Sequence, residues 1–356
     1  MTPSSQQPAP PPRRAAKKPG LADLSPSNFG AVMATGIVSI ALHLLDWPLL
    51  AQALLWLNVL LYTTLWLLTV LRLLRHPRRM LDDAMSHARG PGFFTIIAGT
   101  GVLGSQFVLL RGDYGAALLL WLLTVALWPP MTYGFVAILT TKRHKPPLAQ
   151  GINGAWLLMV VATQSIAVLG TLLAPQLAPE QRLAMRFVAL ALWLWGGMLY
   201  IWLMTLIFYR YTFFPLDPEH LTPPYWINMG AMAISTLAGS LLLLGADEAP
   251  FVASLLPFIK GFTLFYWATA TWWIPMLLVL GVWRHGIRRL PLRYEPLYWG
   301  AVFPLGMYAV CTYDLIAAME LDFMHWLPVL FGVVAVAAWS MAFGGLLHRL
   351  GRQLTR

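Results

Sequence analysis

Ten long apolar segments, separated by short clusters of charged residues, run through almost the whole of this 356-residue chain. A helix needs about 20 mostly apolar residues to cross the hydrocarbon core of a bilayer, and each segment is about that long or longer. The segments are residues 27–45, 49–73, 91–110, 114–141, 149–174, 183–209, 223–245, 251–283, 297–319 and 325–348. Because lipid cannot pair with backbone N–H and C=O groups, such segments cross a bilayer as helices. The predicted fold class is therefore an all-α polytopic membrane protein with ten transmembrane helices.

The charged residues are too few for a soluble domain of this length. They make up 11% of the chain, whereas soluble domains usually carry about 25%. The net charge of +10 could suggest a nucleic-acid partner, but the charges lie in short clusters between apolar segments rather than on one patch. The sequence therefore indicates a lipid bilayer, and no nucleic acid, as the surroundings of the protein.

The Lys and Arg residues predict the orientation of the segments, since basic residues gather in cytosolic loops. If the N-terminus is cytosolic, three of the 24 fall in outer loops (Arg111, Arg182 and Arg186) and Lys260 falls inside the eighth segment, which leaves 20 on the cytosolic side. This split predicts cytosolic N- and C-termini in a bacterial-type inner (plasma) membrane.

The two ends of the chain differ from the apolar segments between them. Residues 1–25 are polar, basic and rich in proline, and they lack the apolar core of a cleavable signal peptide. We expect a disordered basic cytosolic tail at 1–25, one transmembrane domain at 26–350 and a short cytosolic tail at 351–356.

The tryptophans divide the segments into two classes. Of the 17 Trp residues, those in odd-numbered segments are only Trp156, Trp226 and Trp299, whereas Trp47 lies in a loop and the rest lie in even-numbered segments. The middles of the odd segments carry small and weakly polar residues, which let helices approach closely, while bulky aromatics suit a surface that faces lipid. The simplest arrangement places odd helices inside and even helices outside. The alternative is plain helix packing without a pore.

A repeated motif supports this arrangement. Four odd segments open with Pro-x-x-aromatic, and in the fifth an asparagine replaces the proline: the pairs are Pro26 and Phe29, Pro91 and Phe94, Asn153 and Trp156, Pro223 and Trp226, and Pro296 and Trp299. Proline suits the first turn of a helix, where its missing N–H is not needed. The repeat predicts five helical hairpins with the odd helices parallel around a central pore. Five positive helix N-termini and the basic loops would favour anions at the cytosolic mouth.

The same repeat gives a register for the inner helices. Four positions after each aromatic lie Met33, Ala98, Val160, Gly230 and Phe303. If these residues form one layer, Phe303 is its bulkiest side chain and Met33 the second, which is typical of a constriction. The alternative is a phenylalanine that packs between helices.

Ionisable residues inside a membrane are candidates for function, and the apolar segments hold Asp314 and Lys260. The middles of the odd segments contain no Arg or Lys, although a tight carboxylate site would normally use Arg. The expected lining of the pathway is Met33, Thr35, Gly36, Ser39, Ala98, Gly99, Thr100, Gln164, Ser165, Asn228, Gly230, Ser235, Thr236, Gly306 and Thr312. Such a lining favours weak, fast passage of anions over tight binding.

Enzymatic motifs give little support for catalysis. Gly99-Thr100-Gly101-Val102-Leu103-Gly104 matches a dinucleotide fingerprint in letters, but it lies inside an apolar segment and lacks the strand that the mechanism needs. An integral membrane enzyme would need titratable residues at one membrane depth, and His43, Asp314 and Lys260 are too scattered. We expect no enzyme activity, no catalytic residue, no cofactor and no metal.

Several segments together resemble the tellurite-resistance/dicarboxylate transporter family. They are Phe29-Gly30-Ala31-Val32-Met33-Ala34-Thr35-Gly36, Gln164-Ser165-Ile166-Ala167, Trp226-Ile227-Asn228-Met229-Gly230 and Tyr298-Trp299-Gly300-Ala301-Val302-Phe303-Pro304-Leu305-Gly306. The family includes a malate permease, sulfite pumps, a tellurite-resistance protein and slow anion channels. The resemblance implies ten helices as five hairpins around a pore, and commonly a homotrimer.

The resemblance also suggests a substrate and a gate. It implies that Phe303, followed by Pro304, occludes the pore, and that the cargo is a small anion, most simply a C4-dicarboxylate such as malate. The alternatives are an exporter of sulfite, tellurite or another inorganic anion, or an anion channel.

Overall fold

The computed structural model describes residues 20–291 and 296–354, and these residues form helices and no β-strand. The helices are α1 (Gly30–Leu44), α2 (Pro48–Arg75), α3 (Pro77–Ala84), α4 (Phe94–Gln106), α5 (Tyr114–Thr141), α6 (Leu148–Gly151), α7 (Leu158–Leu173), α8 (Pro179–Phe213), α9 (Ile227–Leu244), α10 (Pro250–Ser254), α11 (Leu256–Val282), α12 (Trp299–Met319) and α13 (Trp326–Leu354).

Ten helical stretches of the described chain are long and apolar enough to cross a membrane. They are Pro26–Leu44, Pro48–Arg75, Gly90–Arg111, Tyr114–Thr141, Gly154–Gln176, Pro179–Phe213, Pro223–Leu244, Leu256–Ile287, Trp299–Met319 and Asp322–Arg349. Each overlaps one of the ten predicted segments, so the predicted fold class is confirmed.

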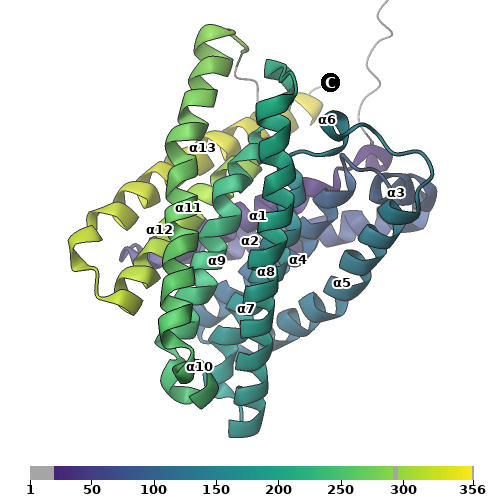
Figure 1. Ribbon diagram of the computed structural model, residues 1–356. Helices are drawn as coiled ribbons and strands as arrows, with labels where there is room; N and C mark the ends of the chain where they lie inside the picture. The colour runs from purple at the N-terminus through teal and green to yellow at the C-terminus, as the bar shows by residue number, and fades with distance from the viewer. Residues whose placement is uncertain (1–19, 292–295, 355–356) are drawn as a thin grey trace, which may run out of the picture.

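The odd-numbered spans form an inner ring. Between 72% and 94% of the residues in their most apolar stretches are buried, against 11% to 50% in the even-numbered spans. Around the ring, α1 packs against α4, α4 against α7, α7 against α9 and α9 against α12, and α12 packs against α1 to close it. In Figure 1, α9 is seen between α8 and α11, and it packs against both.

The outer helices α2, α5, α8, α11 and α13 each cover a groove between two inner helices. Every one of them packs on the inner helix of its own hairpin and on the inner helix of the next hairpin. For the fifth hairpin the next one is the first, since α13 packs on both α12 and α1. The outer helices therefore connect the hairpins into a closed circle.

All five inner helices begin with a tight turn. A single 3-10 turn precedes each of them, at Pro26–Phe29, Gly90–Phe93, Gly154–Leu157, Pro223–Trp226 and Pro296–Tyr298. Proline near the start of such a turn leaves no backbone donor unpaired. In the third hairpin, where proline is absent, the Asn153 side chain accepts a hydrogen bond from the Ala155 N–H at 2.9 Å. The repeated motif thus marks the helix starts.

Two spans start five residues later than the sequence predicted. The fifth was expected from residue 149 and the eighth from residue 251, but the short helices α6 and α10 occupy those positions. The chain is extended at Ile152 and Asn153 before the fifth span. The eighth span restarts at Leu256 because Pro257 fits only the first turn of a helix.

The folded part of the chain also extends further at both ends than predicted. Residues Leu21–Asp23 form a 3-10 turn on α2, where Arg72 Nη2 donates to the Ala22 carbonyl at 3.1 Å. At the other end α13 continues to Leu354, past the predicted domain end at residue 350. Residues 1–19, with the basic part of the expected tail, lie outside the described residues.

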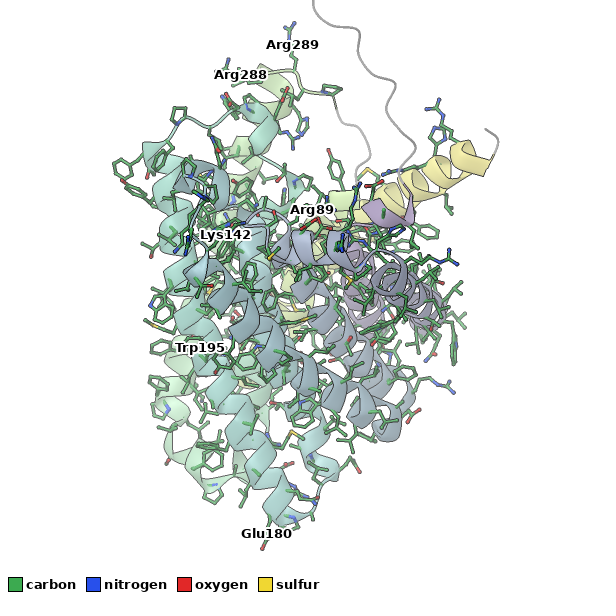
Figure 2. All side chains as sticks on the ribbon, turned by 90° about the vertical axis from the view of Figure 1, so that its right-hand side faces the viewer. Arg89, Lys142, Glu180, Trp195, Arg288 and Arg289 are labelled. Atoms are coloured by element: carbon green, nitrogen blue, oxygen red, sulfur yellow. The ribbon has the colours of Figure 1, made fainter. Side chains whose placement is uncertain are left out.

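Basic side chains mark the end of the molecule at which the inner helices begin. Figure 2 shows Arg89, Lys142, Arg288 and Arg289 toward this basic end and Glu180 at the opposite end. A buried ion-pair cluster lies at the basic end: Asp83 of α3 binds Arg72 at 2.5 Å and Arg89 at 3.0 Å. At the opposite end the buried Arg186 binds Glu248 at 2.7 Å.

Candidate functional site

Each inner helix presents the same spacing of side chains to the axis of the ring. Two cavities lie on this axis, and residues that line them recur at intervals of three and four along every inner helix. This spacing places the residues on one face of a helix. Starting from the basic end, the first layer is Gly30, Thr95, Leu158, Ile227 and Gly300, and the third layer is Ile37, Val102, Ser165, Ile234 and Met307.

Two further layers lie beyond the third layer, and one lies between the first and the third. The fourth layer is Ile40, Ser105, Val168, Leu237 and Val310, and the fifth is Leu44, Leu109, Leu172, Leu241 and Asp314. Between the first and third layers the same spacing gives a second layer of Met33, Ala98, Val161, Gly230 and Phe303. The five layers therefore follow the axis from the basic end toward the opposite end.

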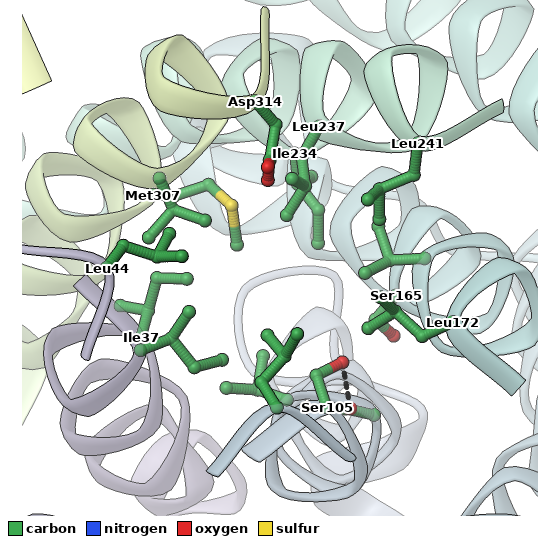
Figure 3. Close-up of a pocket in the computed structure, with 16 residues that line it drawn as sticks. Ile37, Leu44, Ser105, Ser165, Leu172, Ile234, Leu237, Leu241, Met307 and Asp314 are labelled. Carbon is green, nitrogen blue, oxygen red and sulfur yellow. Dashed lines mark hydrogen bonds between the residues drawn. The ribbon is translucent and has the colours of Figure 1, made fainter. Parts of the chain in front are cut away.

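The mouth cavity opens the axis on the side of the basic end. It has a volume of about 30 Å³ and extends from the turns that precede the inner helices to Met33 and Phe303. The far cavity has a volume of about 60 Å³ and is lined by the third, fourth and fifth layers together with Gly101. Figure 3 shows its lining, with side chains from all five inner helices directed to the centre. Cavities of this size hold a few water molecules.

The second layer separates the two cavities. Met33 and Phe303 are the last residues of α1 and α12 to line the mouth cavity, and Ile37 and Met307, four positions further, begin the far cavity. Met33 is 2% exposed and Phe303 is 1% exposed. The second layer therefore lies between the two cavities, with the side chains of Met33 and Phe303 buried in it.

A proline follows directly after Phe303, the bulkiest residue of the second layer. Pro304 lies inside α12, and because proline has no N–H, the carbonyl of Gly300 loses its partner within the helix. The proline ring packs against Gly230 of α9, where an added Cβ atom would lie only 2.7 Å from Cγ of Pro304. Close contact between α9 and α12 thus fixes the helix at the level of Phe303.

Most polar residues that were expected on the axis instead bind the outer helices. In each hairpin an aromatic donor or hydroxyl of the outer helix bonds to the inner helix of the next hairpin: Tyr62 to Thr100 (3.0 Å), Trp128 to Thr163 (2.8 Å), Trp193 to the Ser235 carbonyl (2.8 Å), Trp267 to Thr312 (3.0 Å) and Trp339 to Thr35 (3.0 Å). A hydroxyl group in an apolar interior needs such a partner. The aromatic residues of the even helices therefore hold the ring together, in addition to any contact with lipid.

The remaining members of the expected lining divide into two groups. Met33, Ser165 and Phe303 line a cavity, and Ala98 and Gly230 belong to the second layer. The others contact a neighbouring helix or their own helix: Ser39 the Ala51 carbonyl, Gln164 the Trp193 carbonyl, Asn228 the Tyr211 hydroxyl, Thr236 the Met232 carbonyl, Gly36 the Val102 side chain, Gly99 the Val32 side chain and Gly306 the Ile37 side chain. Apolar side chains consequently dominate the axis.

The two intramembrane charges lie in different surroundings. Asp314 lines the far cavity, and Figure 3 shows its carboxyl group directed toward the centre. Lys260 is exposed on the outer surface of α11 and does not line either cavity. Within the described ranges, no group of three His, Cys, Asp or Glu side chains could hold a metal ion.

The electrostatic field at the basic end favours anions. Five inner helices start there, and the start of a helix carries positive partial charge. Lys142 lies near the loop that holds His87. Burial lowers the pKa of the His87 imidazole, and the charges of Lys142 and Lys145 lower it further. The positive charge of this loop at neutral pH therefore comes from lysine and arginine rather than from His87.

Sequence reasoning did not single out the aliphatic lining of the far cavity. The signal that would have found it is the recurrence of residues such as Ile37, Ile40 and Leu44 at three- and four-residue intervals on every inner helix. The register from the aromatic motif matches the second layer on four helices. On α7 the residue is Val161 rather than Val160, since Leu158 of the first layer follows Trp156 by two positions, whereas in the other hairpins the first-layer residue follows the aromatic by one.

Sequence comparisons relate this chain to known membrane proteins. The sequence model of a family described as voltage-dependent anion channel matches residues 23–347. An uncharacterized transporter of Methanocaldococcus jannaschii is 23% identical over 87% of this chain and 92% of its own length, and a second one is 24% identical over 87% and 91%. An uncharacterized membrane protein of Mycobacterium tuberculosis is 40% identical over 44% of this chain and 80% of its own length.

Proposed function

The chain belongs to the voltage-dependent anion channel family, whose members transport anions, and we propose that it moves C4-dicarboxylates such as malate along the axis of its helix ring, with Phe303 as the occluding residue. The membership agrees with the transporter family that the sequence motifs resemble. Transport of anions is the general function; malate and the role of Phe303 are the specific proposals.

The observation that carries the proposal is the repeated lining of the axis. Five parallel helices contribute one residue each to every layer, and two cavities lie on the axis with the second layer between them. A ring of this kind offers one route across the membrane with a single barrier. The positive helix N-termini and the basic residues at the mouth would concentrate anions there.

Phe303 is the natural candidate for the barrier because it is the largest side chain in the second layer. Its other members include Ala98 and Gly230, whose side chains are small or absent. A change in the side-chain torsions of Phe303 would therefore widen this layer more than a change at any other member. The contact of Pro304 with Gly230 supports this proposal, since it holds α12 in place while the phenyl ring moves.

A second candidate function is the passage of small inorganic anions such as sulfite, tellurite or chloride, as an exporter or a channel. The observation that favours it is the lining itself: no Arg or Lys is among the described residues that line the two cavities. A dicarboxylate has two charges to compensate, and Arg is the usual partner for a carboxylate. An anion with a single charge, such as chloride, needs fewer compensating groups along an apolar axis.

We also propose the orientation and assembly that the sequence and the resemblance suggest. The basic end would face the cytosol of a bacterial-type inner membrane, because Lys and Arg gather in cytosolic loops. The protein would assemble as a homotrimer, with the axis of each protomer as a separate route. Accessibility of single cysteines from either side and the mass of the detergent-solubilised complex test these two points.

The function is tested by flux into liposomes that contain the purified protein. Uptake of labelled malate is measured with sulfite and chloride as competitors, and empty liposomes serve as the control. Malate uptake that excess chloride barely reduces supports the dicarboxylate function, whereas chloride or sulfite flux without malate uptake supports the second candidate. No flux of any anion through a correctly folded protein would overturn both.

A further inference from the structure

The fifth layer of the axis contains one residue that differs from all the others. Four of its members are leucines, from α1, the turn after α4, α7 and α9, and the fifth is Asp314 of α12. Figure 3 shows Leu44, Leu172 and Leu241 around the same space as the carboxyl group of Asp314. Where the ring repeats an aliphatic side chain four times, α12 thus supplies an acid.

Among the residues that the structure describes, no positive charge lies in the far cavity to compensate this carboxyl group. The other residues that line the far cavity are aliphatic, apart from two serines, Met307 and Gly101. The hydroxyls of Ser105 and Ser165 donate to carbonyls of their own helices. No described residue forms a hydrogen bond or an ion pair with the carboxyl group of Asp314.

Other ionisable groups near Asp314 do not line the far cavity. On α12 itself they are the buried thiol of Cys311 and the hydroxyl of Tyr313. The elements packed against α12 include His43 near the end of α1 and Lys260 exposed on α11, and the exposed pair Asp322 and His325 lies just before α13. Asp314 is therefore the ionisable group of the far cavity within the described part of the chain.

A carboxylate in this position would oppose the movement of an anion. Like charges in a poorly hydrated cavity repel strongly because little solvent lies between them. Ionisable residues inside a membrane are costly to bury and commonly mark pathways. A leucine at this position, as on the other four helices, would avoid that cost. We therefore expect Asp314 to have a function.

We propose that Asp314 is a titratable selectivity residue: ionised, it repels anions from the far cavity, and protonated, it lets them pass. The proposal rests on the proposed function, since it assumes that anions follow the axis. It concerns a position distinct from the constriction. Asp314 lies 11 residues beyond Phe303 on α12, which is about 16 Å along the helix axis.

The test is anion flux as a function of pH in liposomes that contain the full-length protein. Nitrate and chloride are the probes, because their charge does not change over the pH range, and the same pH is set on both sides. The variants are Asp314→Asn, which keeps the shape and removes the charge, and Asp314→Leu, which completes the layer of leucines. Asp322→Asn is the matched control, since Asp322 is exposed near the same end and outside the cavity. Each variant is also made with Phe303→Ala, so that the constriction does not mask the effect.

In the wild-type protein, flux should fall by at least about tenfold from acidic to alkaline pH, because deprotonation introduces a repelling charge on the route. Asp314→Asn and Asp314→Leu should both lose this pH dependence and match the acidic wild-type rate at every pH, and Asp322→Asn should keep the wild-type profile. A merely structural role would change the amount of folded protein and leave the profile intact.

The proposal is overturned if either Asp314 variant conducts with the wild-type pH profile, or if wild-type flux does not depend on pH. These results would leave the proposed function standing, because flux is still observed. If neither nitrate nor chloride passes in any sample, the role of Asp314 as a barrier to anions fails, and malate uptake in the liposome assay above decides separately whether the proposed function stands.

Discussion

Gly230 of α9 lies directly against the ring of Pro304 in α12, so that a Cβ atom on Gly230 would be 2.7 Å from Cγ and 3.3 Å from Cα of Pro304. The second of these atoms belongs to the backbone, which cannot rotate away as a side chain can. The absence of a side chain at Gly230 is therefore what lets α9 and α12 approach each other beside Phe303.

Gly230→Ala should separate α9 from α12. Overpacking of this kind costs about 1–3 kcal/mol, so the variant should unfold at a lower temperature than the wild-type protein, and its passive anion flux should rise because Phe303 moves with α12. Gly99→Ala is the matched control: its Cβ atom would lie 3.4 Å from the nearest atoms, an ordinary contact. Equal melting temperatures for the two variants would show that the contact does not constrain the helices.

Thr35→Val tests the hydrogen bonds between outer and inner helices. The change keeps the shape of the side chain but removes the acceptor of the Trp339 Nε1–H bond. Hydrogen bonds between membrane helices contribute about 0.5–1.5 kcal/mol, so thermal stability in detergent should fall by that amount while relative permeability to different anions stays unchanged.

The control for this change is Thr236→Val, because in the described part of the chain the Thr236 hydroxyl bonds only to the Met232 carbonyl of its own helix. That variant should lose less stability than Thr35→Val. A change in anion selectivity with Thr35→Val would indicate instead that its hydroxyl faces the route, as the sequence first suggested.

Asp83→Asn should destabilise the basic end of the molecule. It leaves Arg72, which is buried, without its ion-pair partner. Removing one member of a buried ion pair costs about 3 kcal/mol, and denaturant or thermal unfolding of the purified protein measures the loss. Asp82→Asn changes the neighbouring exposed carboxyl group and should have little effect. Equal stabilities of both variants would show that the cluster contributes nothing.

Much of the architecture could be predicted because the physical signals behind it are local. Long apolar segments predict the ten spans directly, since unpaired backbone N–H and C=O groups cannot lie in lipid. The proline or asparagine before each inner helix marks its first turn, and the spacing from that turn gives the positions of Met33 and Phe303. On α7 the register differs by one residue: Leu158 of the first layer follows Trp156 by two positions, and the turn before α7 begins after Asn153 rather than with a proline.

The surroundings of the polar residues could not be predicted in the same way. Thr35 lies among small residues in the sequence, which is equally consistent with a polar pathway or a packed interface. Its partner Trp339 is 304 residues away, and no local pattern connects the two. Likewise, only the comparison of the five helices shows that Asp314 occupies the position of a leucine, because that comparison needs the register that the structure supplies.

The most direct test of the account is the passive anion flux of Phe303→Ala compared with Phe94→Ala in liposomes. Both changes remove a buried phenyl ring near the start of an inner helix, but Phe94 packs against Phe135 of an outer helix rather than lining a cavity. Phe303→Ala should raise flux at least about tenfold, which corresponds to a barrier lowered by about 1.4 kcal/mol, and Phe94→Ala should leave it at the wild-type level. Equal flux in the two variants, or a flux in Phe303→Ala no higher than in the wild-type protein, would contradict the assignment of Phe303 as the residue that closes the axis.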